Sequence, residues 1–333
     1  MDSARLHHIV AGFADRRVLV IGDLMLDEFV WGKVSRISPE APVPVVNVTS
    51  ESYYPGGAAN VARNVREFTP ATAVMGIAGT DAQGARLLGL LEAAGIDTSA
   101  VECDASFPTA VKTRIIARNQ QVVRVDRERK THLTEEQIER AMRRLDRAMG
   151  EVEAIIVADY GKGYLSQPLA DYICRAAREQ GKILAVDPHP HTSLCWHNAT
   201  AVKPNRAEAF SAAGVTPSDP GEPPASDRAL LEAARRLESL WEPKSLLITL
   251  GEQGMLLFEA GKAPYHIPTR AQDVFDVSGA GDTALAVFTL GLASGATPAE
   301  AADLANRASG IAVGKLGTAT VTMGELLAEF SEA

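Results

Sequence analysis

The sequence predicts an α/β fold built on a mostly parallel sheet, with a second, smaller β-sheet at its edge. Short apolar runs alternate with longer amphipathic segments, which is the pattern of βαβ units. Several amphipathic segments begin with capping-box residues, so the helix starts agree with the periodicity. Two β-rich stretches with no helical pattern inside them predict the smaller sheet.

The elements follow in chain order. The apolar runs expected as buried strands cover residues 18–21, 73–77, 154–158, 183–186, 199–202 and 245–250. The capping boxes pair Thr134 with Gln137, Thr297 with Glu300 and Thr322 with Glu325, and Pro298 occupies a first helical turn. The segment 216–227, rich in Pro, Ser and acidic residues, is typical of a surface loop rather than a linker. We therefore expect residues 1–333 to form a single domain.

The β-rich stretches cover residues 29–48 and 109–126. Exposed strand edges need covering, so this small sheet is expected either to cover a substrate cleft as a lid or to pair with a second subunit. The two arrangements are compatible with each other.

Composition excludes several classes of protein. The chain is 46% apolar and 23% charged, as in soluble globular proteins, and no apolar run reaches the ~18 residues of a membrane span. The N-terminus lacks the apolar segment of a secretory signal, so we expect a cytoplasmic protein. A net charge of −9 opposes binding to nucleic acid or to an anionic membrane. The three cysteines are widely spaced and predict no disulfide framework.

The most informative segment is Asp-Val-Ser-Gly-Ala-Gly-Asp at 276–282, which precedes a long helical pattern. Glycines at a helix N-terminus would leave the amides of Gly279, Ala280 and Gly281 free to form an anion hole for a transferring phosphoryl group. Asp282, at the rim of that hole, is the candidate general base for an incoming hydroxyl. A dinucleotide-binding loop has a similar glycine pattern, but no acidic strand end follows about 20 residues later. A plain glycine turn would leave both flanking aspartates unexplained.

Two further segments are candidates for nucleotide binding. Thr249, Gly251 and Gly254 lie where an apolar strand enters a tight turn, which permits close approach of a nucleotide. An ordinary hairpin has the same pattern. No P-loop motif occurs, so a nucleotide would not be bound in the P-loop manner.

The other nucleotide-binding candidate is the helix start at Asn205, Arg206, Ala207 and Glu208. Asn205 and Glu208 lie one turn apart on the same helix face and could orient water around Mg²⁺. A helix-capping Asn beside an ordinary surface Glu explains the pattern equally well.

Polar residues near the first strand predict a sugar site. Asp23 and Asp27 lie at its carboxyl end, where ligands of open α/β sheets bind, and carboxylates suit sugar hydroxyls. Gly56, Gly57 and Asn60 open the next helix, with glycines that allow close approach and an amide that both donates and accepts. Together with the separate anion hole, these groups favour a kinase over a hydrolase.

Four more polar residues are candidates for holding a sugar or its phosphate: Arg118, Asn119, Gln120 and Lys162. A lone lysine in a glycine turn is also typical of a solvated side chain. The three histidines between 189 and 197 follow an Asp-Pro pair, which indicates a turn rather than a metal site.

Together these motifs resemble the ribokinase-like (PfkB) carbohydrate kinases over nearly the whole chain. Gly-Gly-Ala-Ala-Asn at 56–60 followed by Asp-x-Ser-Gly-Ala-Gly-Asp at 276–282 is a specific signature of that family. Further segments are similar to the D-glycero-β-D-manno-heptose-7-phosphate kinases of lipopolysaccharide precursor synthesis, namely 22–27, 35–45, 118–121 and 313–318.

The resemblance implies a three-layer α/β/α sandwich with a β-sheet lid, and transfer of the ATP γ-phosphate to O1 of the heptose phosphate. It implies Asp282 as the base, an anion hole at 279–281, and Mg²⁺ held through water by Glu208. The implied nucleotide residues are 205–208, Thr249, Gly251 and Asn306, and the implied sugar residues are Asp27, Gly56, Gly57 and Asn60. Family members often dimerise through the lid, so we expect a homodimer.

The chain departs from the family pattern in two ways. His189 and Pro190 stand where close relatives commonly have Lys-Gly, which alters the contacts expected near that turn. Many heptose kinases are fused to a nucleotidyltransferase, but no H-x-G-H motif occurs in this sequence, so we expect the later adenylylation to need another protein. Two alternatives remain: a kinase of the same fold acting on another sugar, and a silent sugar or nucleotide sensor, which the intact Asp282 disfavours.

Overall fold

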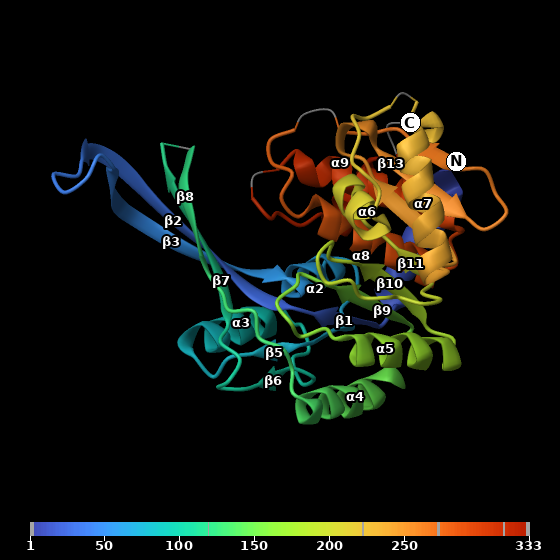
Figure 1. Cartoon of the computed structure of the whole chain (residues 1–333), viewed down its shortest axis with the longest axis horizontal. Helices are drawn as coiled ribbons and strands as arrows, with labels where there is room; N and C mark the ends of the chain where they lie inside the picture. Colours follow the sequence, from blue (N-terminus) through green and yellow to red (C-terminus); the bar gives the residue numbers. More distant parts are fainter. Residues whose placement is uncertain (1–2, 119, 222, 272–273, 316, 331–333) are drawn as a thin grey trace.

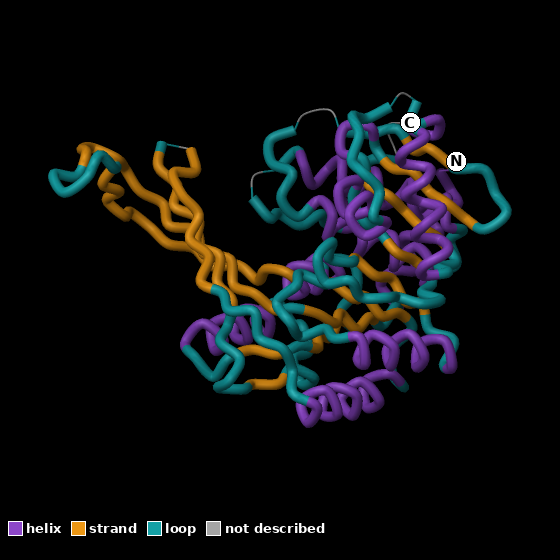
Figure 2. Tube along the Cα trace, viewed as in Figure 1, coloured by secondary structure: helices purple, strands orange, loops and turns teal. Residues whose placement is uncertain are grey.

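The computed structural model describes residues 3–118, 120–221, 223–271, 274–315 and 317–330. An eight-stranded sheet lies between two layers of helices, and a four-stranded lid projects from this body (Figure 1 and Figure 2). The α/β class predicted from the sequence is confirmed, with helices on both faces of a mostly parallel sheet.

Each predicted apolar run contributes a strand to the central sheet, although Ile77, at the end of the run 73–77, belongs to a separate two-stranded sheet. Its strand order is β14 (Tyr265–Ile267), β13 (Met255–Glu259), β12 (Ser245–Thr249), β11 (Ala201–Val202), β10 (Ile183–Asp187), β9 (Ala154–Ala158), β1 (Val18–Gly22) and β4 (Thr72–Met75). The six strands from β12 to β4 run parallel to one another, and β13 is antiparallel to both β12 and β14. β1 and β9 are buried at every residue, as expected of parallel strands covered on both faces.

Alternating side chains of the central strands pack into two separate hydrophobic cores, one on each face of the sheet. Val18 and Val20 of β1 pack toward one helix layer, whereas Leu19 and Ile21 pack toward the other. The first layer contains α1 (Ser3–Ala11), α2 (Ala58–Arg66), α3 (Ala82–Ala93), α8 (Ala280–Ala293), α9 (Pro298–Val313) and α10 (Met323–Ala328). The second contains α4 (Glu135–Met149), α5 (Gln167–Glu179), α6 (Arg206–Ala213) and α7 (Arg228–Trp241). Short 3-10 turns complete the chain: η1 (Gly12–Asp15), η2 (Pro224–Ser226) and η3 (Gly251–Gln253).

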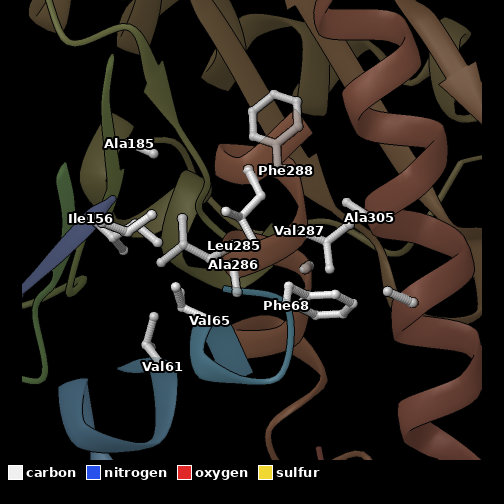
Figure 3. Close-up of a cluster of buried hydrophobic side chains, with 14 of the residues drawn as sticks. Val61, Val65, Phe68, Ile156, Ala185, Leu285, Ala286, Val287, Phe288 and Ala305 are labelled. Carbon is white, nitrogen blue, oxygen red and sulfur yellow. The ribbon is translucent and has the colours of Figure 1, made fainter. Parts of the chain in front are cut away.

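Helix α8 lies at the centre of the first layer. Its residues Leu285 and Phe288 pack among Val65 of α2, Ile156 of β9 and Ala305 of α9 (Figure 3). Because α8 contacts the sheet on one side and helices on the others, it is apolar nearly all round. The first turn of α8, which carries the glycine motif, is therefore anchored by the core.

The lid is formed by β3 (Pro44–Gly57), β2 (Leu24–Ile37), β7 (Ala110–Ala117) and β8 (Gln120–Arg127), in that order. The β2–β3 and β7–β8 pairs are antiparallel, and β2 runs parallel to β7. A separate two-stranded sheet pairs β5 (Ile77–Ala78) with β6 (Glu102–Cys103). The first lid hairpin is longer than the predicted 29–48, because residues 24–28 and 49–57 also belong to its strands. Residues 24–26 and 55–57 form the buried base of the lid.

The outer part of the lid is exposed. Trp31 is 39% exposed, stacks on Phe29 with ring centroids 6.2 Å apart, and donates its indole N–H to Ser52 Oγ at 3.2 Å. Trp196 and Trp241, by contrast, are buried in the body.

The predicted helix starts are confirmed. Thr134, Thr297 and Thr322 each cap their helix in a capping box, and α6 begins with a fourth capping box at Asn205. Over the described ranges, no helix combines the length and apolarity that crossing a membrane would need.

Candidate active site

A cavity of about 1070 Å³ opens at the carboxyl ends of the central strands. This is the edge where ligands of open α/β sheets bind. The strands β9, β10, β11 and β12 each contribute residues at or just beyond their last position, α8 contributes its first turn, and β7 contributes one wall from the lid.

Most predicted site residues line this cavity: Asp27, Gly57, Asn60, Asn205, Arg206, Ala207, Glu208, Thr249, Gly251, Gly254, Gly279, Ala280, Gly281, Asp282 and Asn306. Residues separated by more than 200 positions in the sequence thus share one chamber. Asp23, Gly56, Arg118, Gln120 and Lys162 do not line it. Asn119 lies outside the described residues.

The carboxylate of Asp282 is held from two sides. Asn60 Nδ2 donates to Oδ2 at 2.6 Å, and the Tyr160 hydroxyl donates to Oδ1 at 2.6 Å. Burial raises the pKa of Asp282 to about 6, although the bonds from Tyr160 and Asn60 oppose that rise. At neutral pH the group is therefore an oriented carboxylate with its basicity increased.

Tyr160 is fixed as a donor to that carboxylate. Burial raises the pKa of its hydroxyl well above the usual value, and the nearby Asp282 charge raises it further. Its backbone amide donates to Asp23 Oδ2 at 3.0 Å, and Asp23 also accepts the amides of Lys162 and Tyr164. Asp23 thus holds the turn that presents Tyr160 instead of facing the cavity.

The first turn of α8 differs in one respect from the expected anion hole. Gly279 is the N-cap residue with φ of 83°, a left-handed conformation that favours glycine. The amide of Ala280 donates to the carbonyl of Val277 at 3.3 Å, so the expectation that it is free is wrong: the turn closes on itself there. Within the described part of the chain, the amides of Gly279 and Gly281 have no such acceptor.

A buried lysine lies beside these glycines. The side chain of Lys203 is only 3% exposed, and its Nζ is 3.0 Å from Asp187 Oδ2. A Cβ placed on Gly281 would lie 3.6 Å from the same Nζ, so the ammonium group borders the start of α8. Burial lowers the pKa of Lys203, but Asp187, Glu208 and Asp282 outweigh it and leave the pKa above its usual value. Lys203 is therefore a permanent cation at this end of the cavity.

The start of α6 confirms the capping interpretation of Asn205 and Glu208. The Asn205 side chain accepts the Glu208 amide at 2.9 Å, and Glu208 Oε2 accepts the Asn205 amide at 2.7 Å. Both residues also line the cavity, so capping does not remove them from the site. Arg206 Nη2 is bound to Asp227 at 2.6 Å, which directs this guanidinium toward the following loop.

The remaining predicted nucleotide residues lie around the β12–β13 turn. The hairpin alternative is confirmed, since β12 and β13 are antiparallel and joined by η3. Thr249, Gly251 and Gly254 nevertheless line the cavity. Asn306 of α9 closes the same side and donates to the carbonyl of Pro268 at 2.7 Å.

The lid residues Lys112 and Arg114 form the opposite wall. Arg114 Nη1 lies 2.5 Å from Asp27 Oδ1. A Cβ on Gly56 would lie 2.5 Å from Asp27 Oδ2, so glycine at this position leaves room for the carboxylate. Gly56 therefore supports Asp27 from behind.

The candidates at the far end of the lid lie elsewhere. Arg118 and Gln120 border a separate hollow of about 550 Å³, together with residues 34–37 of β2. Lys162 Nζ forms an ion pair with Glu128 at 2.7 Å. The structure therefore does not bring these three residues into the cavity of this chain.

Sequence reasoning missed several residues that line the cavity: Lys112, Arg114, Tyr160, Asp187 and Lys203. For the last three the signal was available, because Asp187 and Lys203 directly follow predicted strands and Tyr160 lies two residues after one, all at the ligand-binding edge. For the first two the signal was weaker, since only the period-2 alternation of a lid strand puts them on one face.

Comparison with known proteins shows the family to which the chain belongs. The model of the family described as pfkB family carbohydrate kinase matches residues 15–323. A "Bifunctional protein HldE" from Desulfatibacillum aliphaticivorans is 41% identical over 334 residues, covering 100% of this chain and 67% of that protein. Another from Citrifermentans bemidjiense is 44% identical over 313 residues, covering 94% and 63%. The chain thus spans about two thirds of the length of these relatives.

Solved structures share the fold at low identity. Arabidopsis thaliana ribokinase in complex with ribose and ATP has a TM-score of 0.69 at 18% identity, covering 95% of this chain and 98% of that one. The tetrameric inhibited form of phosphofructokinase-2 from Escherichia coli has a TM-score of 0.73 at 20% identity, covering 95% and 99%. The fold is ribokinase-like. With the family model matched along most of its length, the chain belongs to the pfkB family of carbohydrate kinases and is a sugar kinase, a phosphotransferase.

Proposed function

We propose that this kinase transfers the γ-phosphoryl group of ATP to O1 of D-glycero-β-D-manno-heptose 7-phosphate, giving the 1,7-bisphosphate for ADP-heptose and lipopolysaccharide precursor synthesis. The observation that carries the proposed chemistry is the Asp282 carboxylate, held between Tyr160 and Asn60 beside the glycine start of α8. The choice of heptose phosphate is supported by the similarity to HldE proteins along nearly the whole chain.

The proposed step begins at Asp282. Its carboxylate accepts the proton of the acceptor hydroxyl, and the oxygen attacks the γ-phosphorus as the bond to the β-phosphate oxygen of ADP breaks. The amides of Gly279 and Gly281 and the ammonium group of Lys203 face the charge that develops on the transferring group. Because the start of α8 and the Lys203–Asp187 ion pair keep these groups in place, little reorganisation is needed during the reaction.

Tyr160 and Asn60 are positioning residues in this scheme. Each occupies one oxygen of Asp282, which fixes the plane of the carboxylate while leaving further lone pairs for the acceptor hydroxyl. Both lower the pKa of Asp282 and so keep it ionised near neutral pH.

We assign the other lining residues to the nucleotide. Residues 205–208 would face its phosphates, and Thr249, Gly251, Gly254 and Asn306 would border its remaining part. We assign Mg²⁺ to a water-mediated site at Glu208, because Mg²⁺ retains waters when it bridges phosphates. Mg²⁺, when bound, would neutralise negative charge on those phosphates.

The proposal includes a homodimer formed through the lid. The lid carries exposed apolar side chains on its strands, among them Val123 and Val125 of β8. Such strands favour a covering partner. Since ATP is the phosphate donor, the proposal also includes a cytoplasmic location. Light scattering should give twice the chain mass, and Val123→Lys should shift the protein toward the monomer.

A coupled ADP-release assay tests the proposed reaction. With Mg-ATP, heptose 7-phosphate, fructose, fructose 6-phosphate and ribose are compared as acceptors. A strong preference for heptose 7-phosphate in kcat/KM is the expected result. Preference for another sugar would overturn the assigned acceptor while keeping the Asp282 chemistry, and no turnover with any of them would contradict the proposed reaction.

A further inference from the structure

Two cations face the cavity from one lid strand. Lys112 and Arg114 are separated by one residue on β7, so their side chains lie on the same face of the strand. Both line the cavity, while Thr113 between them is buried and donates to Glu28 on the other face. The lid thus adds positive charge to a cavity that is otherwise lined mostly by residues of the body.

The two cations differ in how they are neutralised. The guanidinium group of Arg114 is bound to Asp27 at 2.5 Å and lies over the ring of Phe29, with its carbon 5.2 Å from the ring centroid. Lys112 is half-buried and forms no ion pair with any described residue, although Asp27 is its register partner on β2. Lys112 is therefore the uncompensated cation of this wall.

Neighbouring charges offset only part of the cost of burying the Lys112 ammonium group. Lys162 forms an ion pair with Glu128 at 2.7 Å. Burial lowers the pKa of Lys112, and repulsion from Lys162 lowers it further, while Asp27 and Glu128 act in the opposite direction. An anion bound at Lys112 would restore the interaction that the ammonium group loses on leaving water.

A line of contacts joins this lysine to the reacting end of the cavity. Asp282 is bound by Asn60, which follows the Gly56–Gly57 segment at the start of α2. Gly56 packs against Asp27, and Asp27 is the register partner of Lys112. These neighbours outline a path along Asp27 from Asp282 toward Lys112.

We propose that Lys112, with Arg114 beside it, is the subsite for a phosphate monoester on the acceptor sugar, at the end of the molecule opposite the reacting hydroxyl. This inference rests on the proposed function, because it assigns the charged group of that acceptor. A compact ammonium charge suits a phosphate dianion, and the forked guanidinium beside it offers N–H groups that Asp27 does not occupy. This proposal assigns the phosphate contact to the base of the lid instead of to the lid residues predicted from the sequence, Arg118 and Gln120.

The experiment compares Lys112→Met with wild type on heptose 7-phosphate and on the same heptose without its phosphate. Loss of a charged hydrogen bond should lower kcat/KM for the phosphorylated sugar by about 10- to 100-fold and leave the unphosphorylated sugar nearly unchanged. Lys112→Arg should restore part of the loss. Lys33→Met, which removes the same charge from an exposed position on β2, is the matched control and should behave as wild type.

Equal losses on both sugars, or no loss on either, would overturn the inference. Calorimetric titration measures the affinity for heptose 7-phosphate without ATP, so it tests the phosphate subsite separately from the proposed reaction. If wild type turns over no sugar, the proposed function fails, and weaker binding of the sugar phosphate to Lys112→Met still supports the subsite. Equal affinity of the two proteins for that probe overturns the subsite even if the kinase reaction is confirmed.

Discussion

At the proposed phosphoryl end of the cavity, the lining groups are main-chain amides and side chains of the central strands and the start of α8. At the proposed acceptor end, the lining groups include the long side chains of Lys112 and Arg114 on β7 of the lid. Lys203 is 3% exposed and held by Asp187, whereas Lys112 is half-buried and has no ion-pair partner among the described residues. One end is fixed by hydrogen bonds and an ion pair within the protein, whereas Lys112 at the other end has no such partner among the described residues. Substitutions at the two ends should therefore affect different kinetic parameters.

The largest effect is expected at the base. Asp282→Asn should lower kcat by about 10²- to 10⁴-fold, since an amide cannot accept the hydroxyl proton, while ATP affinity stays nearly unchanged. Steady-state kinetics and ATP titration measure the two quantities. Asp146→Asn, an exposed change on α4, is the matched control. Retained turnover in Asp282→Asn would contradict the role of Asp282 as the general base.

Lys203→Met should lower kcat by about 10²-fold, because a preorganised charge at the transferring group is lost. It should also lower the melting temperature, since the partly buried Asp187 carboxylate would lose its cation. The double variant Lys203→Met/Asp187→Asn should regain stability but not turnover. If turnover returns together with stability, Lys203 has only a structural role.

A smaller effect is expected when Tyr160 is replaced. Turnover needs ionised Asp282, so activity should fall as the pH drops through about 6, the raised pKa of this carboxyl group. Tyr160→Phe removes a donor that lowers this pKa, so the acidic limb of the kcat/KM profile should move up by about one pH unit. An unchanged limb would show that Tyr160 does not tune the base.

The smallest effect is expected when the N-cap residues of two helices are replaced. Thr134→Ala and Asn205→Ala should each cost about 1 kcal/mol of unfolding free energy, because each removes the N-cap acceptor of a capping box. Only Asn205→Ala, which is at the cavity, should raise KM for ATP. Denaturant unfolding and kinetics of both variants test this, and matching KM values would argue against a nucleotide role for the start of α6.

The contrast between the two ends also explains which parts were predictable from the sequence. The phosphoryl end depends on local patterns: a glycine run before an apolar helix and polar residues after buried strands. These patterns located Asp282, Gly279 and the start of α6. They could not show that the Ala280 amide bonds to Val277, because that contact depends on how the turn closes.

The acceptor end depends on how lid strands pair, which local patterns do not reveal. Lys112 and Arg114 reach the cavity because β7 runs parallel to β2, a pairing between segments about 85 residues apart. Arg118 and Gln120, on neighbouring positions of the same hairpin, lie by a different hollow. Asp23 was placed at the correct strand end, but its role as a turn anchor depends on three amides that follow β9.

The position of Trp31 gives the lid an optical signal of its own. Trp196 and Trp241 are shielded inside the body, so a water-soluble quencher such as acrylamide should reach Trp31 first. Changes in that quenchable fluorescence as acceptor is added would follow the lid without any attached dye. The same titration with ATP would show whether nucleotide binding also changes the quenching of Trp31 on the lid.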